Sequence, residues 1–267
     1  MSSVPLPPST DGLQPIPDFW IERPMPMPTT AGTNRINWNL RYDNPKAFSH
    51  SYEINANPGE TPAGPEGPLV APGTYTIRLT VDGRSMSQTV LVKNDPRSPA
   101  SSSDIKSQAD MQSSLYFGAR EAWDGFQAVA KVRSILADIL TTEPAAELVD
   151  ATSNFDAKLA LIGGSGGGGR RFGGGGFPPA GGAPPASTFA GVMGSMMRYL
   201  GSMDTGDMAP NEVMVKNAKA AGVDLKTAAA NWKLINGKEL AAYNVVLAKY
   251  KIKPIRSAFQ DALTASK

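Results

Sequence analysis

The stretch Gly67 to Arg97, GPLVAPGTYTIRLTVDGRSMSQTVLVKNDPR, decides what the front half of the chain can form. Apolar and polar residues alternate along its first part, which predicts a strand with one apolar and one wet face. The apolar positions are Tyr75, Ile77, Leu79 and Val81, with Met86, Val90 and Val92 after the turn. Asp82-Gly83 accepts the positive φ angles of a tight turn. The pattern predicts a half-buried antiparallel hairpin.

A second alternating run precedes this hairpin. Its apolar positions are Ile36, Trp38, Leu40 and Tyr42. Period two with a heavy aromatic face predicts a strand, and residues 43–72, rich in Pro and Gly, predict a long surface connection with at most one short strand. We therefore predict that residues 34–98 form an N-terminal immunoglobulin/fibronectin-like antiparallel β-sandwich in an α+β protein.

The predicted strands are fewer than the roughly seven of such a sandwich. Residues 1–33 form a Pro-rich extended lead-in, interrupted by the apolar cluster Phe19, Trp20 and Ile21, which we expect to dock onto the sandwich rather than to form an edge strand. Either this lead-in supplies the missing strands, or protein outside the chain completes the sheet. An open sheet edge would otherwise favour aggregation.

The pattern changes to helical spacing after Pro99. Ser101 to Asp104 are good N-cap residues, and an apolar stripe then predicts one long helix as far as Leu140. Glu143-Pro144 ends it, and a second stripe predicts an antiparallel partner, so that residues 100–162 form a helical hairpin. The members of this second stripe are Leu148, Thr152, Phe155, Leu159 and Ile162.

A Gly/Pro-rich flexible loop, residues 163–187, separates this hairpin from a second helical pair at 188–255. That pair begins with a short Met-rich helix from Phe189 to Met203. A stripe from Met214 to Ile235 follows, which we expect Gly237 to end, and a last stripe runs from Leu240 to Tyr250. Together the helices predict an up-and-down bundle of about four helices with the Gly-rich segment as an inserted loop.

Composition excludes several classes of function. The 267 residues hold 26 Lys and Arg against 24 Asp and Glu, so a net charge of +2 gives no long-range field for nucleic acid. There is no cysteine, which excludes disulfides, thiolate zinc sites and thiol nucleophiles. No apolar run is long enough to span a membrane, and the N-terminal residues carry no export signal.

No motif indicates chemistry, and we predict no catalytic, cofactor-binding or metal-binding residue and no cofactor. His50 is the single histidine, which excludes a catalytic triad and a two-histidine metal site, so we expect a solvated loop residue. The acids Asp104, Asp110, Glu121, Asp124 and Asp138 lie largely off the apolar stripe. The run GGSGGGGRR lacks the Lys and Ser/Thr of a phosphate-binding loop. Arg170, Arg171 and Phe172 form a single copy of a pattern found in RNA-binding segments. We expect both motifs to be part of a spacer.

Two alternatives concern aromatic and sulfur-containing residues. The methionines at 193, 196, 197 and 203 are expected to fill the core rather than to form a promiscuous binding surface. Trp20, Trp38 and Tyr42 are a candidate sugar-stacking platform, although a core tryptophan of the sandwich explains Trp38 with fewer assumptions.

Several segments together resemble a known protein family. They are NRINWNLRYDNP (34–45), GPLVAPGTYTIRLTVDG (67–83), VLVKNDPR (90–97) and NWKLINGKELAAYN (231–244). They are similar to the C-terminal region of large bacterial propeller proteins described as BNR/Asp-box glycosyl-hydrolase-like or sortilin-like. The resemblance implies a sandwich and helical bundle that follow propellers, and a periplasmic or secreted location. No Asp-box and no propeller repeat occurs in this chain.

Three functions follow as hypotheses. The first is a non-catalytic accessory module that docks with a β-propeller protein, as part of an exported glycosidase-like or sortilin-like assembly. The second, inherited from the resembled family, is a glycosyl hydrolase or carbohydrate-binding protein. The third is a cytoplasmic adaptor that uses the Gly-rich arm. A protein partner is expected, a carbohydrate is possible in the second case, and neither a nucleic acid nor a membrane span is expected.

Overall fold

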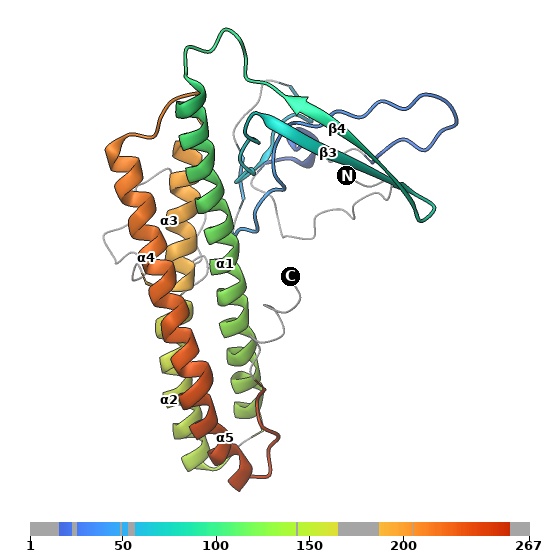
Figure 1. The fold of residues 1–267 in the computed structure, drawn as a ribbon. Helices are drawn as coiled ribbons and strands as arrows, with labels where there is room; N and C mark the ends of the chain where they lie inside the picture. The colour runs from blue at the N-terminus through green and yellow to red at the C-terminus, as the bar shows by residue number, and fades with distance from the viewer. Residues whose placement is uncertain are drawn as a thin grey trace. The chain divides into compact units, whose positions relative to one another are not determined.

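The computed structural model describes residues 16–22, 26–48, 50–52, 57–142, 144–164, 187–204 and 206–256. The chain divides into two compact units. The hairpin unit comprises Met1–Ala109 and Gly206–Ala209, and the helical unit comprises Asp110–Thr205 and Pro210–Lys267. Figure 1 shows the elements of both.

The hairpin predicted around Asp82-Gly83 is confirmed. Strand β3 (Gly73–Val81) pairs antiparallel with β4 (Arg84–Val92), and Val81 lies opposite Arg84. The two turn residues have φ angles of 48° and 77°. This is the left-handed geometry that a two-residue hairpin turn needs to match the twist of its strands.

The β-sandwich predicted for residues 34–98 is wrong. The described residues of this unit form two separate two-stranded antiparallel sheets, β3–β4 and the short pair β1 (Ser51–Tyr52) with β2 (Ala63–Gly64). The protein is mostly helical, and no second sheet is stacked on the hairpin within the described ranges. The hairpin consequently has no covering layer of strands among the described residues.

The run from Ile36 to Tyr42 fails as a strand because its backbone turns in the middle. The Asn39 carboxamide oxygen accepts a hydrogen bond from the Arg41 amide at 3.1 Å, and Leu40 has a φ of 59°. Asparagine side chains compete in this way with sheet hydrogen bonds, and a left-handed residue reverses the chain direction. What remains of strand pairing is a single bridge between Arg41 and Leu69.

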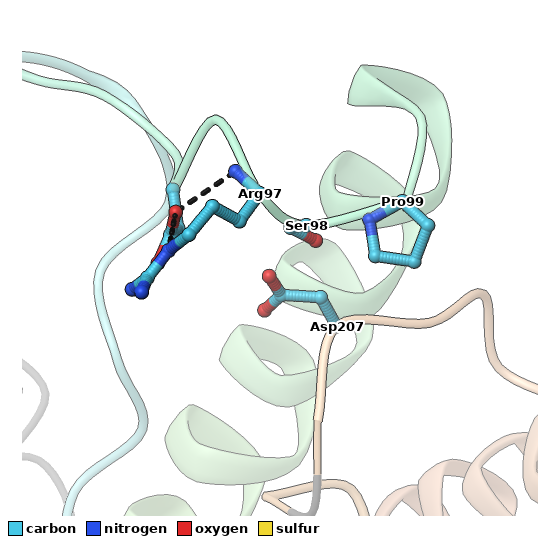
Figure 2. Close-up of a pocket in the computed structure, with 5 residues that line it drawn as sticks. Arg97, Ser98, Pro99 and Asp207 are labelled. Atoms are coloured by element: carbon cyan, nitrogen blue, oxygen red, sulfur yellow. Dashed lines mark hydrogen bonds and ion pairs between the residues drawn. The ribbon is translucent and has the colours of Figure 1, made fainter.

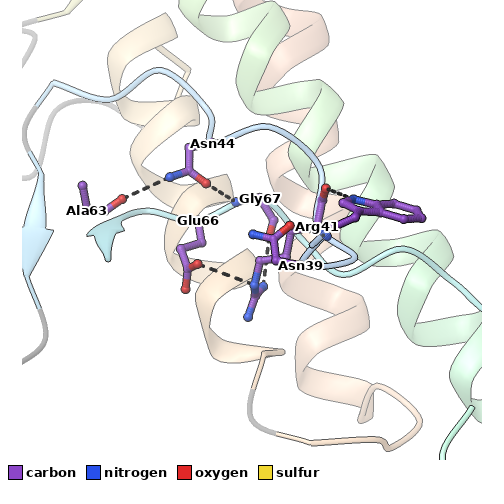
Figure 3. Close-up of polar contacts among 7 residues, drawn as sticks. Asn39, Arg41, Asn44, Ala63, Glu66 and Gly67 are labelled. Carbon is purple, nitrogen blue, oxygen red and sulfur yellow. Dashed lines mark hydrogen bonds and ion pairs between the residues drawn. The ribbon is translucent and has the colours of Figure 1, made fainter. Parts of the chain in front are cut away.

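Arg41 connects this turn to the chain around residue 67 (Figure 3). Its guanidinium donates to the Gly67 carbonyl at 2.9 Å and lies 3.6 Å from the Glu66 carboxylate. Asn44 accepts from the Gly67 amide at 3.2 Å, and a Cβ at residue 67 would lie 2.1 Å from the Tyr42 carbonyl. Side-chain contacts to backbone therefore replace the missing ladder, and the close approach requires glycine.

The lead-in is ordered by one bridge and a short turn in its described part. Residues Asp18–Trp20 form a 3-10 turn, and Ile21 pairs with Thr61 in parallel orientation. Phe19 stays 61% exposed, so the apolar cluster does not dock as a whole in the way the sequence predicted. Residues 1–15 and 23–25 lie outside the described ranges.

The long helix predicted to start at the cap of Ser101 to Asp104 and to reach Leu140 is confirmed. Helix α1 (Ser102–Leu140) begins with a reciprocal capping box. The Ser101 hydroxyl accepts from the Asp104 amide at 3.1 Å, and the Asp104 carboxylate accepts from the Ser101 amide, also at 3.1 Å. This arrangement satisfies two backbone donors that a helix start leaves open.

Helices α2 (Ala146–Gly163) and α3 (Phe189–Ser202) together form one column of the helical unit, antiparallel to α1 (Figure 1). Contacts with α1 follow in unbroken reverse order along both helices: Gln112 with Met203, Gly118 with Met196, Gly125 with Phe189, Val129 with Gly163, and Arg133 with Asp156. Gly164, just after α2, faces Thr188, the N-cap of α3. The Gly-rich segment therefore interrupts a single column.

The third column is one continuous helix, and the predicted end at Gly237 is wrong. Helix α4 (Glu212–Leu234) runs through a π-helical segment, η2 (Ile235–Glu239), into α5 (Leu240–Lys249). Glycine weakens a helix but does not stop it when flanking turns are packed. A π-helical segment adds a residue to the turn, which keeps the stripes of α4 and α5 on one side. The bundle thus has three columns in cross-section.

The stripes predicted for these helices form the core of the helical unit. All five members of the α2 stripe are buried, and Phe155 stacks on Tyr243 with ring centroids 4.8 Å apart. The buried Thr152 hydroxyl lies 2.7 Å from the Tyr243 hydroxyl. Burial raises the pKa of Tyr243, against the opposite effect of this hydrogen bond. Of the four methionines expected in the core, Met193, Met196 and Met203 are buried, and Met197 is half-buried.

Candidate interaction surface

One face of the β3–β4 hairpin carries almost all of its large apolar side chains. Residues directly opposite each other in an antiparallel pair share a face. The register places Tyr75 opposite Val90, Leu79 opposite Met86, and Ile77 opposite Gln88. The exposed fractions are 52% for Ile77, 40% for Leu79, 50% for Val81 and 62% for Met86. We call these four residues the hairpin face.

The prediction that this hairpin is half-buried is therefore wrong. Only its base, near Tyr75, Val90 and Val92, is partly buried, and the rest of both strands is exposed. A usable signal was present in the sequence. The two-residue turn places Gln88 and Arg84 on the same side of the hairpin as these four residues, opposite Ile77 and Val81. A side that is covered by a second sheet seldom includes such polar residues.

The base of the hairpin is anchored through Tyr75. Its hydroxyl donates to the Ala71 carbonyl at 2.6 Å, and its ring meets the edge of Trp38 at a centroid distance of 5.7 Å. Burial, and to a lesser degree the nearby Tyr42, raises the pKa of Tyr75. These contacts hold the root of the two strands while the tip projects into solvent.

Both outer edges of the hairpin are available for strand pairing. β3 and β4 pair with each other and with no further strand of the described residues. Neither strand contains proline. Edge strands of this length carry rows of unpaired amide and carbonyl groups, which natural proteins cover or interrupt. The hairpin thus offers backbone hydrogen bonds and an apolar face together.

A depression beside the end of β4 is lined by Asp95, Arg97, Ser98, Pro99 and Asp207 (Figure 2). It is an open hollow of about 470 Å³. Arg97 donates to the Asp95 carboxylate at 2.6 Å and 3.0 Å, and its side chain extends away from Asp207.

Asp95 is not suited to act as the general acid of glycoside cleavage. Hydrogen bonds from Arg97 lower the pKa of Asp95. A glycosidase needs one carboxyl group with a raised pKa, so that it is protonated and can donate to the leaving group. The pair of Asp95 and Arg97 instead orders a turn, in which the Ser98 amide donates to the Asp95 carbonyl at 3.0 Å.

The remaining residues considered from the sequence do not converge. His50 is exposed in a loop, with Nδ1 3.2 Å from the Gly64 carbonyl. Trp20 contacts the ring of Phe19, whereas Trp38 contacts that of Tyr75, so the two tryptophans belong to separate ring pairs. Arg170, Arg171 and Phe172 lie outside the described residues. Within the described part, no group of three or more His, Asp or Glu side chains could hold a metal ion.

No protein-family model, no characterised protein and no solved structure matches this chain. The resemblance to BNR/Asp-box and sortilin-like propeller proteins therefore stays a prediction. In the part of the chain that the structure describes, every helix is too short or too polar to cross a membrane.

Proposed function

We propose that this chain is a non-catalytic interaction module whose hairpin docks onto a β-sheet partner. The observation that carries the proposal is the exposed hairpin face on two nine-residue strands. A two-stranded hairpin alone is marginally stable in water and needs a third strand or a packed face. Addition of a partner strand would satisfy an open edge and cover apolar side chains in one step.

The partner class we propose is a β-propeller protein of the BNR/Asp-box or sortilin-like kind. Two separate arguments support it. The sequence segments quoted above resemble the region that follows propellers, and they include the hairpin itself. Each propeller blade is a four-stranded antiparallel sheet with a short outer edge, and strand addition by the hairpin would extend that sheet.

The test is binding of a purified propeller domain of this class to the full chain, measured by calorimetry. The double variant Ile77→Ser with Leu79→Ser should weaken binding at least about tenfold, since interface residues that are apolar and central dominate affinity. The matched control is Thr76→Ser with Arg78→Ser, on the opposite face of the same strand. It should change binding less than about threefold.

Absence of binding by the native chain would reject the propeller as partner. Equal losses in the two double variants would reject the hairpin face as the docking surface. The hydrolase alternative makes a different prediction, namely turnover of a glycoside panel that one Asp or Glu substitution abolishes. Nothing in the described residues favours it, and the adaptor alternative rests on residues 165–186, which are outside them.

A further inference from the structure

A second surface, on the helical unit, has a regular pattern that the hairpin docking does not use. Along the outer side of α4, exposed residues follow one another at steps of three and four: Lys216, Lys219, Val223, Lys226, Ala230 and Lys233. We call these six residues the basic row. At 3.6 residues per turn they form a nearly straight line parallel to the helix axis.

The basic row lies opposite the side of α4 that packs into the bundle. The buried residues of α4 are Ala221, Leu225, Ala228 and Trp232, which also follow steps of three and four. α4 therefore carries two stripes with helix-packing period on opposite sides. The first is covered by α1, α2 and α3, as contacts of Leu225 with Gly118 and of α4 with α2 and α3 demonstrate. The second is exposed.

The continuous helix of α4 and α5 is more positively charged than the rest of the chain. Glu212 to Lys249 contains six lysines and three acids, whereas the whole chain has a net charge of only +2. Glu239 is paired with Lys158, and Asp224 lies off the row and is half-buried. The four lysines of the basic row have no ion pair with any residue in the described ranges. Glu212 is exposed four residues before Lys216, in line with the row, so the positive charge is concentrated between Lys219 and Lys233.

The residues between the lysines favour a helix as the ligand. Val223 and Ala230 are small, so a second helix could approach at the usual distance of about 8 to 10 Å. Lys219, Lys226 and Lys233 are seven residues apart, which is the interval at which carboxylates recur along a heptad helix. Lysine stems can cover the apolar contact while their ammonium groups reach flanking carboxylates.

Other polyanions fit this row less well. Nucleic-acid surfaces usually combine positive charge with arginine or aromatic side chains that pair with phosphate or stack on bases, and the basic row has neither. Membrane-surface helices carry large apolar anchors such as Trp, Phe or Leu on the buried side. Between its lysines the row has only Val223 and Ala230, and the one leucine exposed on α4, Leu234, lies at its C-terminal end, so there is no series of apolar anchors. Neither surface would require the alternation of three and four.

We infer that the basic row of α4 is a docking site for an acidic α-helix of a partner protein, with carboxylates at heptad spacing and small or apolar residues between them. The partner helix would lie along α4, as in a two-stranded coiled coil. This surface shares no residue with the hairpin face.

The experiment uses the full chain and two synthetic peptides of about 28 residues, long enough to be helical. One repeats a heptad with Ala and Leu at the contact positions and Glu beside them, and the other has the same composition in scrambled order. Fluorescence anisotropy should give at least about tenfold tighter binding of the heptad peptide, and its affinity should fall between about 50 and 200 mM salt.

The triple variant Lys219→Glu, Lys226→Glu and Lys233→Glu should lose about tenfold or more in affinity for the heptad peptide. The control triple variant Lys93→Glu, Lys131→Glu and Lys253→Glu changes net charge equally at exposed positions off the row, and should stay within about threefold. Circular dichroism of both variants verifies that the helices are retained.

Three results would overturn the inference. One is equal binding of the two peptides, which would mean that charge alone acts. Another is an equal loss in the two triple variants. The third is binding of a DNA duplex or of phosphatidylglycerol vesicles without binding of the heptad peptide.

Discussion

The hairpin unit and the helical unit use their apolar residues in opposite ways. In the helical unit the apolar stripes meet one another, and Phe189, Leu159 and Leu247 are almost completely buried. In the hairpin unit an equally regular stripe stays exposed, because no layer of the described residues covers it. The difference teaches that a regular apolar pattern identifies a contact surface without stating whether the partner is in the same chain.

The largest expected effect is loss of a core side chain in the helical unit. Phe189→Ala removes a ring that is 1% exposed and lies against Gly125. We expect the free energy of unfolding to fall by about 3 to 5 kcal/mol. Leu161→Ala, at a residue that is 74% exposed, should cost less than about 0.5 kcal/mol. Urea unfolding followed by circular dichroism measures both, and similar losses would contradict the burial described for α3.

Substitutions at two glycines test the same packing, with smaller expected changes in the free energy of unfolding. A Cβ at Gly125 would lie 2.4 Å from the Phe189 ring, whereas a Cβ at Gly222 would meet nothing within 4 Å. Gly125→Ala should destabilise the helical unit by about 1 to 3 kcal/mol through overpacking. Gly222→Ala should stabilise it by about 0.5 to 1 kcal/mol through helix propensity. Urea unfolding should show that the two variants change the free energy of unfolding in opposite directions. A change in the same direction would refute the close contact between α1 and α3.

Substitutions in the hairpin face should hardly change the stability of the helical unit. Ile77→Ser with Leu79→Ser removes exposed side chains, so the unfolding transition of the helices should move by less than about 0.5 kcal/mol. The helical signal at 222 nm reports on that transition. A loss near that of Phe189→Ala would mean that the hairpin face packs within the chain, and the contrast between the two units would then disappear.

The smallest effect concerns an exposed ion pair between α2 and α5. Hydrogen bonds from Lys249 and Tyr250 lower the pKa of Glu147 below its ordinary value of 4.5. Because the folded-state pKa is depressed, the stabilisation is complete above the unfolded-state pKa and is lost as pH falls through the folded-state pKa. Glu147→Gln should flatten the decline of melting temperature below pH 4.5, and an unchanged decline in a series of thermal melts would contradict this prediction.

The helices could be predicted in detail because their evidence is local. The capping box at Ser101 and Asp104 closes within one turn, and the α2 stripe is visible in the spacing of its own residues, although it packs on Tyr243 far along the chain. The prediction at Gly237 was wrong because the low helix propensity of glycine favours a helix end there. The packing of α4 and α5 instead stabilises one continuous helix through this residue. That α2 and α3 share a column could not be predicted, since the intervening Gly-rich segment leaves the order of contacts open.

The strands could be predicted only where the turn and the pairing are adjacent in sequence. Asp82-Gly83 sets the register of β3 and β4, and that register is observed. The run around Trp38 has a strand pattern as good as that of β3, yet the hydrogen bond from the Arg41 amide to Asn39 bends it. The exposed hairpin face and the basic row needed the structure, which shows what each stripe contacts.

The sequence by itself determined the hairpin turn, the helix caps and the apolar stripes of the bundle, because hairpin and helix hydrogen bonds close between near neighbours. Only the tertiary structure decided that no second sheet of the described residues covers the hairpin and that α4 exposes the basic row. The physical reason is that the burial of a sheet or helix face depends on segments far away in the chain. The local alternation of apolar and polar residues does not indicate whether such segments pack against that face.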